Sequence, residues 1–322
     1  MSVLLRGVPF NTDEQLDCFT LALESLLRFY GLDLALLHFD QWHFSAQAAG
    51  RGQLQLAAQT RDYAASLARF GVELRAAQEA DFASGWEALC AELDQGRPLL
   101  VILDTPPLRA CYYPGQPRHS LHAVVVNGCD TEEVWIVDPS PYTAFAGAIP
   151  LEIFGRAWQG GEAFTWYALR VPAARGSRAP RELQRCLAQN IEGMLGGQRA
   201  GWGISGIRRL AEWLGEVATW PESEVGPLLT QATQLKGVAL ARRMHARFLD
   251  SAAARLEQPA LSIVGEQLQE VAQEWMVARN LALKGGRSGS GAVAARLGRR
   301  LWALAEWEEL LLGGLAAEVD RG

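Results

Sequence analysis

The sequence predicts an α+β N-terminal domain with an antiparallel sheet, followed by an all-α helical domain. Before about residue 172, helical patterns alternate with short apolar runs of strand length, and after it the pattern is almost wholly helical. Between these halves lies VPAARGSRAP, whose Ala, Arg, Gly and Pro content is typical of a linker. A chain of 322 residues is long enough for two hydrophobic cores. We therefore expect a mixed domain at 1–172, a linker at 173–180 and a helical domain at 181–322.

The first half yields helices and strands in alternation. An amphipathic stretch, DCFTLALESLLRFYG, predicts a helix after Asp17, and LQLAAQTRDYAASLARF predicts another at 54–70, followed by a short strand VEL. The run FASGWEALCAELDQG predicts a helix that ends at Gly96, with the buried strand PLLVILD after it. HAVVVN and VWIVD, joined by the turn GCDTEE, predict a hairpin, and FTWYALRV at 164–171 predicts a further strand.

The second half predicts a helical bundle. Its breakers are the glycine pair at 196–197, Pro221, Pro259 and the segment GGRSGSG at 285–291. The expected helices between these breakers are 181–194, 204–218, 224–254, 260–283 and 291–318. The apolar part of the last helix, 301–318, is a candidate interface for a homo-oligomer.

Composition and charge exclude several classes of protein. Hydrophobic residues make up 49% and charged residues 20%, which is ordinary for a soluble globular protein. The apolar N-terminal run is far too short for a signal peptide, and no run approaches the length that spans a membrane, so we expect a cytoplasmic protein. Nucleic-acid binding is poorly supported, because no concentrated basic run is interleaved with aromatic residues.

The charge is unevenly divided between the halves. Residues 1–172 hold 11 arginines and no lysine against 20 acidic residues, a net charge of −9. Of the 30 basic and 36 acidic residues in the chain, 19 and 16 are therefore left for 173–322, a net charge of +3. A weakly basic second half can attract an acidic partner.

The five cysteines point to reduced thiols and not to a disulfide framework. They form no CxxC pair, and their number is odd in a long chain. The histidine pairs 119/122 and 38/43 lack a second ligand pair at a familiar metal spacing, so we expect no metal and no bound cofactor.

Three residues carry the leading chemical hypothesis. Cys18 lies at the front of an amphipathic helix, and His122 and Asp138 lie on the two strands of the predicted hairpin. Cys, His and Asp are the parts of a thiol nucleophile, its base and the group that orients the base. A cysteine in the first turn of a helix has a lowered pKa, because unpaired N–H groups and the helix dipole stabilise its thiolate. This combination predicts acyl transfer.

Alternative interpretations remain at each position. Asp17 fits an N-cap directly before Cys18, but Thr12 and Gln15 fit a capping box that would start the helix earlier and move Cys18 away from its start. We favour the later start. His119 is a rival base, and a single cysteine on an apolar helix is more often a buried small hydrophobic residue than a catalyst.

The ordered set of motifs resembles a known family. DC…ALxxLLxxYG from Cys18 to Gly31, GRPLLVILD, HxVVVxG and VWIVDP resemble the papain-like fold of bacteriocin-processing cysteine peptidases, and more closely the butirosin biosynthesis protein H family. In the second half, GISGIRRLAEWL, RRMHARFLDSAA and LQEVAQEWMVARNLAL are similar to the helical domain that accompanies this family's N-terminal domain.

This resemblance implies a cysteine acyltransferase of secondary-metabolite biosynthesis. The acyl or aminoacyl group would come from the phosphopantetheine thioester of a carrier protein and pass to an amine acceptor, with Cys18 as nucleophile, His122 as base and Asp138 as the orienting carboxylate. Papain-like enzymes usually place a Gln about six residues before the Cys as oxyanion donor. Thr12 occupies that position here, so Gln15 and Asn11 are the nearest candidate amides.

Two other classes of function remain open. A cysteine peptidase or thioesterase would use the same three residues, and a non-catalytic scaffold protein would use none of them.

Overall fold

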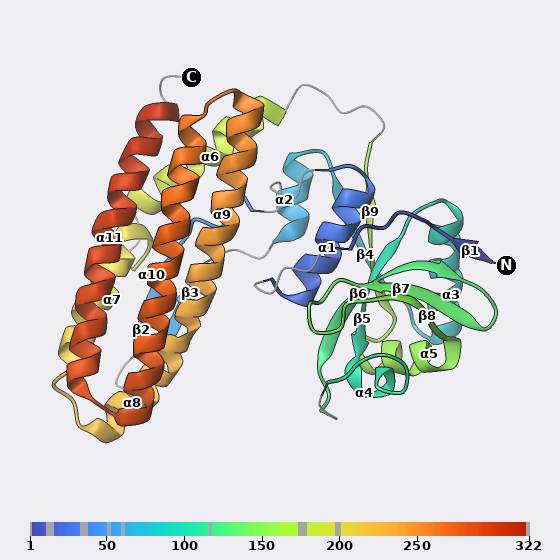
Figure 1. Cartoon of the computed structure of the whole chain (residues 1–322), viewed down its shortest axis with the longest axis horizontal. Helices are drawn as coiled ribbons and strands as arrows, with labels where there is room; N and C mark the ends of the chain where they lie inside the picture. Colours follow the sequence, from blue (N-terminus) through green and yellow to red (C-terminus); the bar gives the residue numbers. More distant parts are fainter. Residues whose placement is uncertain are drawn as a thin grey trace. The chain divides into compact units, whose positions relative to one another are not determined.

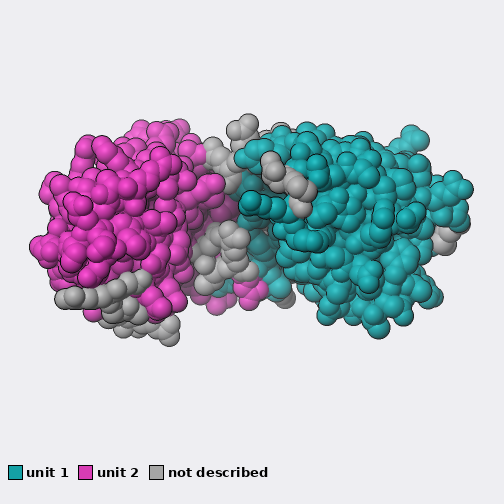
Figure 2. Space-filling model, turned by 90° about the horizontal axis from the view of Figure 1, so that it is seen from below, with its two compact units in different colours: residues 1–34, 63–175 teal, residues 35–62, 176–322 magenta. Residues whose placement is uncertain are grey.

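The structure is a computed structural model in which the chain divides into two compact units (Figures 1 and 2). Unit 1 comprises residues 1–34 and 63–175, and unit 2 comprises residues 35–62 and 176–322. The structure describes residues 2–10, 16–32, 38–49, 53–58, 62–115, 118–172, 179–196 and 201–319. Within these ranges, none of the helices combines the length and apolar character needed to cross a bilayer.

Unit 1 is an antiparallel sheet covered by helices. The strands follow the order β4-β9-β5-β6-β7-β8, and β1 pairs with β6. All of these strand pairs are antiparallel. The strands are β1 (Val3–Leu4), β4 (Glu73–Gln78), β5 (Leu99–Asp104), β6 (Leu121–Cys129), β7 (Glu133–Asp138), β8 (Phe145–Pro150) and β9 (Thr165–Arg170). The helices are α1 (Cys18–Phe29), α2 (Tyr63–Arg69), α3 (Phe82–Asp94), α4 (Thr105–Leu108) and α5 (Leu151–Gly160).

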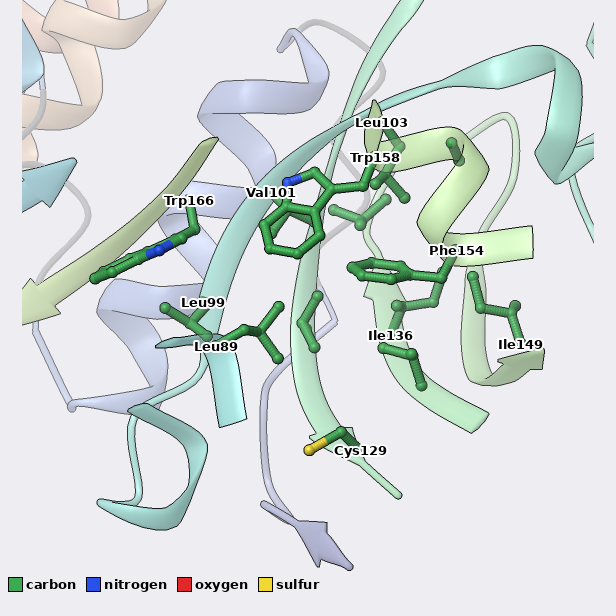
Figure 3. Close-up of a cluster of buried hydrophobic side chains, with 14 of the residues drawn as sticks. Leu89, Leu99, Val101, Leu103, Cys129, Ile136, Ile149, Phe154, Trp158 and Trp166 are labelled. Atoms are coloured by element: carbon green, nitrogen blue, oxygen red, sulfur yellow. The ribbon is translucent and has the colours of Figure 1, made fainter. Parts of the chain in front are cut away.

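One face of this sheet holds the main apolar core of unit 1. Because β5 and β6 pair with Val101 opposite Val124, alternate side chains of both strands project to the same face. They pack against leucines of α3 and against Phe154 and Trp158 of α5 (Figure 3). The side chains of opposite parity, including Leu100 and Val125, are also fully buried. Both faces are therefore covered, which explains the continuous apolar run LLVIL.

Helix α1 packs on β5 and β6 and thereby places its first residue near the hairpin. Its leucines at 21, 23, 26 and 27 are fully buried, as the spacing of the amphipathic stretch predicts. The predicted helix at 82–96, the strand PLLVILD, the hairpin and the strand at 164–171 are all present as α3, β5, β6–β7 and β9. The structure adds β8 and α5, which the sequence analysis left unassigned.

Unit 2 contains a helical bundle and a two-stranded hairpin. Its helices are α6 (Ala179–Leu195), α7 (Gly203–Val217), α8 (Glu222–Gln231), the short 3-10 helix η2 (Ala232–Gln234), α9 (Leu235–Leu256), α10 (Ala260–Ser288) and α11 (Gly291–Val319). The hairpin is formed by β2 (Ser45–Ala49) and β3 (Gln53–Ala57). The predicted helix 224–254 is divided into three pieces, and α10 continues through Gly285 and Gly286 into the segment expected to break it.

The division of the chain differs from the single boundary expected near residue 172. Residues 35–62 group with the helical bundle, because their aromatic side chains Trp42 and Phe44 are buried there among helices. Leu54 of β3 is also buried, and its backbone N–H donates to the side chain of Gln231. The expected linker at 173–180 lies mostly outside the described residues, and α6 already begins at residue 179.

The predicted helix at 54–70 was wrong at its start and is present only at its end. The structure has strand β3 at Gln53–Ala57 and helix α2 at Tyr63–Arg69, on either side of the boundary between the two units. Leu54 and Leu56 are two residues apart, which is the spacing of one face of a strand, and both belong to β3, which pairs with β2. Tertiary pairing here overrides the local pattern.

Candidate active site

The candidate nucleophile lies at the N-terminus of α1. Asp17 is the N-cap: its backbone is extended, and its carboxylate accepts a 2.9 Å hydrogen bond from the N–H of Thr20. Helix α1 therefore begins at Cys18, and the earlier start by a capping box at Thr12 is not the one adopted. The first N–H groups of a helix have no partner within the helix and carry its positive dipole end. Cys18 occupies the position where these groups stabilise an anion.

The candidate base and its orienting carboxylate come from β6 and β7. His122 Nε2 and Asp138 Oδ2 are 2.7 Å apart, and both side chains are buried. The second oxygen of Asp138 accepts a 3.0 Å bond from the N–H of Ser140, just beyond the end of β7. Because Nε2 is bonded to Asp138, the other ring nitrogen of His122 is left to face the thiol.

The Cys18 thiol interacts with His122 and with the backbone of the same strand. Burial raises the pKa of Cys18, but hydrogen bonds with the His122 ring and with the N–H of Ala123 act against it, and the net result is a lowered pKa. The pairing of β6 with β7 begins at Val125. Ala123 lies two residues before it in β6, so its N–H is available to the Cys18 sulfur. Ala123 was not among the predicted site residues, because its contribution comes from its backbone and not from its side chain.

The charge state of His122 complements that of the thiol. Burial lowers the pKa of His122, but the hydrogen bond to Asp138, followed by the bond to Cys18, outweighs burial and raises the pKa to about 9. At neutral pH these two directions favour a thiolate paired with an imidazolium. The arrangement can therefore attack a carbonyl carbon and donate a proton to the departing group.

Residues 17–139, which contain all three of these side chains, match the family model described as "Butirosin biosynthesis protein H, N-terminal". This region is a butirosin biosynthesis protein H-like domain. Residues 160–315 match a second family model, "Domain of unknown function (DUF4872)". Among solved structures, the chain is similar to a protein described as a C39-like peptidase from Bacillus anthracis, with 16% identity and a TM-score of 0.37 over 54% of this chain and 100% of that one. A comparison with curated proteins found no match. The family match and the site geometry support a papain-like cysteine enzyme.

Two tyrosines lie close to the His122–Asp138 pair of the butirosin biosynthesis protein H-like domain. The ring of Tyr113 lies edge-on to His122, with 5.1 Å between ring centroids, and Tyr112 stacks on Phe145 at 4.2 Å. Burial, followed by the charge of Asp138, raises the pKa of Tyr112, which keeps this residue a neutral phenol. These two tyrosines were not among the site residues predicted from the sequence; their position in the chain just before the strand that carries His122 was the available signal.

The rival base His119 contacts a different carboxylate, that of Asp104. His119 Nδ1 and Asp104 Oδ2 are 2.5 Å apart, and the side chain of His119 is 88% exposed whereas that of His122 is 6% exposed. The thiol of Cys18 interacts with His122 and not with this second pair. In this structure His122 is therefore the histidine positioned to serve Cys18.

The predicted oxyanion donors fall in the segment before α1. Asn11 and Gln15, the two candidates from sequence, lie outside the described residues. The N–H of Cys18 is a backbone donor of the helix start. Within the described part of the chain, no three His, Cys, Asp or Glu side chains are grouped as metal ligands would be.

Proposed function

We propose that this protein is a cysteine acyltransferase. It takes an acyl or aminoacyl group from the phosphopantetheine thioester of a carrier protein and transfers the group to an amine. The observation that carries the proposal is the Cys18 thiol at the start of α1, hydrogen-bonded to His122 with its pKa lowered, within a domain similar to a biosynthesis protein. A helix start and an imidazolium suit a nucleophile that attacks a thioester.

The first half-reaction forms an acyl-enzyme. The thiolate of Cys18 attacks the thioester carbonyl, and the tetrahedral oxyanion develops next to the N–H groups at the start of α1. The carbon–sulfur bond to pantetheine then breaks, and the leaving sulfur takes the proton of His122. The products are acyl-Cys18, neutral His122 and free pantetheine thiol. One thioester replaces another, so this step needs no energy source.

The second half-reaction delivers the acyl group. A neutral amine attacks the carbonyl of acyl-Cys18, and His122 accepts a proton from the attacking nitrogen. The bond from carbon to the Cys18 sulfur breaks, which releases the amide and restores the thiolate and imidazolium. Asp138 keeps the ring of His122 oriented throughout, because its bond to Nε2 fixes which nitrogen faces the sulfur.

The carrier protein is proposed to dock on the basic second half of the chain. The proposed partner is a carrier protein with an acidic surface, and residues 173–322 have a net positive charge that would attract it. Arg287 and Arg299 are exposed on unit 2 and are suitable for charge removal. If neutralising such arginines leaves the affinity for the carrier unchanged, this docking role is excluded.

Product analysis separates transfer from hydrolysis. The purified protein is incubated with an acyl-carrier thioester, with and without added amines, and the products are weighed by mass spectrometry. The proposal predicts an amide that forms only with the amine and that a Cys18→Ala variant does not form. Free acid in equal yield under both conditions would instead assign a thioesterase, and unchanged thioester would assign a scaffold.

A further inference from the structure

One pair of neighbouring thiols in unit 1 lies outside the candidate active site. The Sγ atoms of Cys90 and Cys129 are 3.1 Å apart. A disulfide bond is about 2.05 Å long, so these sulfurs need to approach by only about 1 Å to become bonded. All five cysteines fall within the described residues and carry free thiols, and this is the pair that the fold brings together.

The two cysteines are held by different elements of the fold. Cys90 lies in α3, next to the buried Leu89. Cys129 is the last residue of β6, and its backbone pairs with Val3 of β1 and Val134 of β7. Cys129 is 1% exposed and belongs to the core cluster of this face (Figure 3), whereas Cys90 is only partly buried. The strand pairing fixes the buried sulfur, and an oxidant reaches the other one from solvent.

We propose that Cys90 and Cys129 form an oxidation site that converts reversibly to a disulfide. The oxidant is a peroxide. The Cys90 sulfur attacks hydrogen peroxide, the O–O bond breaks, and Cys90 becomes a sulfenic acid with release of one water. The sulfur of Cys129 then attacks the Cys90 sulfur, the S–O bond breaks, and a second water leaves. Two thiols lose two electrons in total, and one peroxide gains them.

The local chemistry agrees with these separate roles. The hydrogen bond from Cys129 lowers the pKa of Cys90 despite the opposing effect of burial, so Cys90 has the more reactive thiol of the pair. The same contact, followed by burial, raises the pKa of Cys129. Cys111 differs from Cys90, because it has no thiol partner within 4 Å among the described residues. Although Cys111 is mostly exposed, the part of it that is removed from water raises the pKa of its thiol.

The site is tested on the full-length protein with hydrogen peroxide as the oxidant. Cys18 is also reactive, so the Cys18→Ala variant serves as the background. After peroxide at about one equivalent, we expect the mass of this variant to fall by two hydrogen atoms, and peptide mapping should join the segments that contain Cys90 and Cys129. A thiol reductant should restore the original mass. A Cys111→Ser change should leave the cross-link intact.

A trapping experiment keeps the proposal falsifiable if a variant is destabilised. In Cys129→Ser, the Cys90 sulfenic acid has no resolving thiol, and dimedone should label it several times more than in the parent. Circular dichroism of the same sample shows whether it is folded. The proposal is overturned if peroxide leaves both cysteines open to alkylation, or if the cross-link joins another pair.

Discussion

At the residue scale, the pKa values of Cys18 and His122 are shifted in the directions opposite to those that burial alone would produce. Cys18 is partly buried and His122 is buried, which by itself disfavours the charged form of each. Their mutual hydrogen bond, together with Asp138 and the N–H of Ala123, reverses the direction for both residues. The ion pair is therefore a product of the specific contacts on β6 and β7, and removing any one contact has a predictable sign.

The thiol of Cys18 should react at a lower pH than an ordinary cysteine. In the His122→Ala variant, the bonded and charged ring is gone while burial remains, so the pKa of Cys18 should rise above its ordinary value. The rate of alkylation by iodoacetamide, followed by peptide mapping of Cys18, measures this as a function of pH. Identical pH profiles for the two proteins would mean that the ring does not stabilise the thiolate.

The carboxylate of Asp138 should control the alkaline limit of activity. The pKa of His122 is raised to about 9, and leaving-group protonation requires the protonated ring, so acylation should decline as the pH rises through this value. Asp138→Asn keeps the shape but removes the charge, so the pKa of His122 should fall and the decline should move to lower pH. At neutral pH we expect acylation to slow by about tenfold or more.

An NMR titration of the His122 ring provides the check for this variant. If the ring titrates at the same pH in Asp138→Asn and in the wild type, the carboxylate is not the cause of the raised pKa.

At the element scale, the N-terminus of α1 depends on its cap. Asp17→Ala should lower the free energy of unfolding by about 1 kcal/mol, because the N–H of Thr20 loses its side-chain acceptor. The charge of Asp17 also raises the pKa of Cys18, so the same change should lower the pKa of the thiol further. Chemical denaturation measures the first effect, and the pH dependence of alkylation measures the second.

Asp81 provides a matched control for this cap. It caps α3 with the same 2.9 Å bond geometry, from the N–H of Ser84, but away from the site. Asp81→Ala should therefore cost a similar amount of stability and leave the reactivity of Cys18 unchanged. A change in Cys18 reactivity in both variants would trace the effect to general loosening of the fold.

The elements predicted from the sequence were those with strong local signals. Three predicted elements are present: the amphipathic helix after Asp17, the helix ended by Gly96 and the hairpin that carries His122 and Asp138. In these elements the capping residues, the spacing of apolar residues and the turn residues all favour the same structure. The pairing of Cys18 with His122 also follows from these elements. By contrast, β3 and the donor N–H of Ala123 depend on where strands begin and stop pairing, and no residue type marks those points.

At the scale of the whole molecule, residues 35–62 join the helical unit through a buried charge. Arg242 and Glu308 are fully buried, with 2.9 Å between Nη2 and Oε2. The indole N–H groups of Trp42 and Trp275 donate to the same carboxylate, and Arg242 also donates to the backbone carbonyl of His43. Every oxygen of Glu308 is thereby satisfied, and this segment of the chain supplies part of the network.

Removing the charge of Glu308 should therefore be costly. Glu308→Gln leaves the buried Arg242 without a counter-charge, and we expect a loss of about 3–5 kcal/mol in the free energy of unfolding. The neighbouring Glu309 forms a partly exposed ion pair with Arg208, so Glu309→Gln should cost about 1 kcal/mol or less. Thermal and urea melts followed by the helical circular dichroism signal compare the two. Equal losses would contradict a structural role for the buried pair.

Because residues 35–62 belong to unit 2, a truncation after residue 172 divides unit 2 instead of separating the two units. A fragment 1–172 retains residues 35–62 but loses the helices around Trp42 and Phe44, so it should expose these side chains and aggregate. Replacing 35–62 in that fragment by a short Gly/Ser linker should restore solubility, measured by size-exclusion chromatography. If the unmodified fragment is monomeric and folded, residues 35–62 do not depend on the helical unit.

The most direct test of the account is the mass of the protein after exposure to an acyl-carrier thioester in the absence of amine. We expect one acyl group on Cys18, identified by peptide mapping, and its loss as an amide when amine is added. An unmodified Cys18, or amide formation at the wild-type rate by the Cys18→Ala variant, would contradict the central claim that this thiol carries the acyl group.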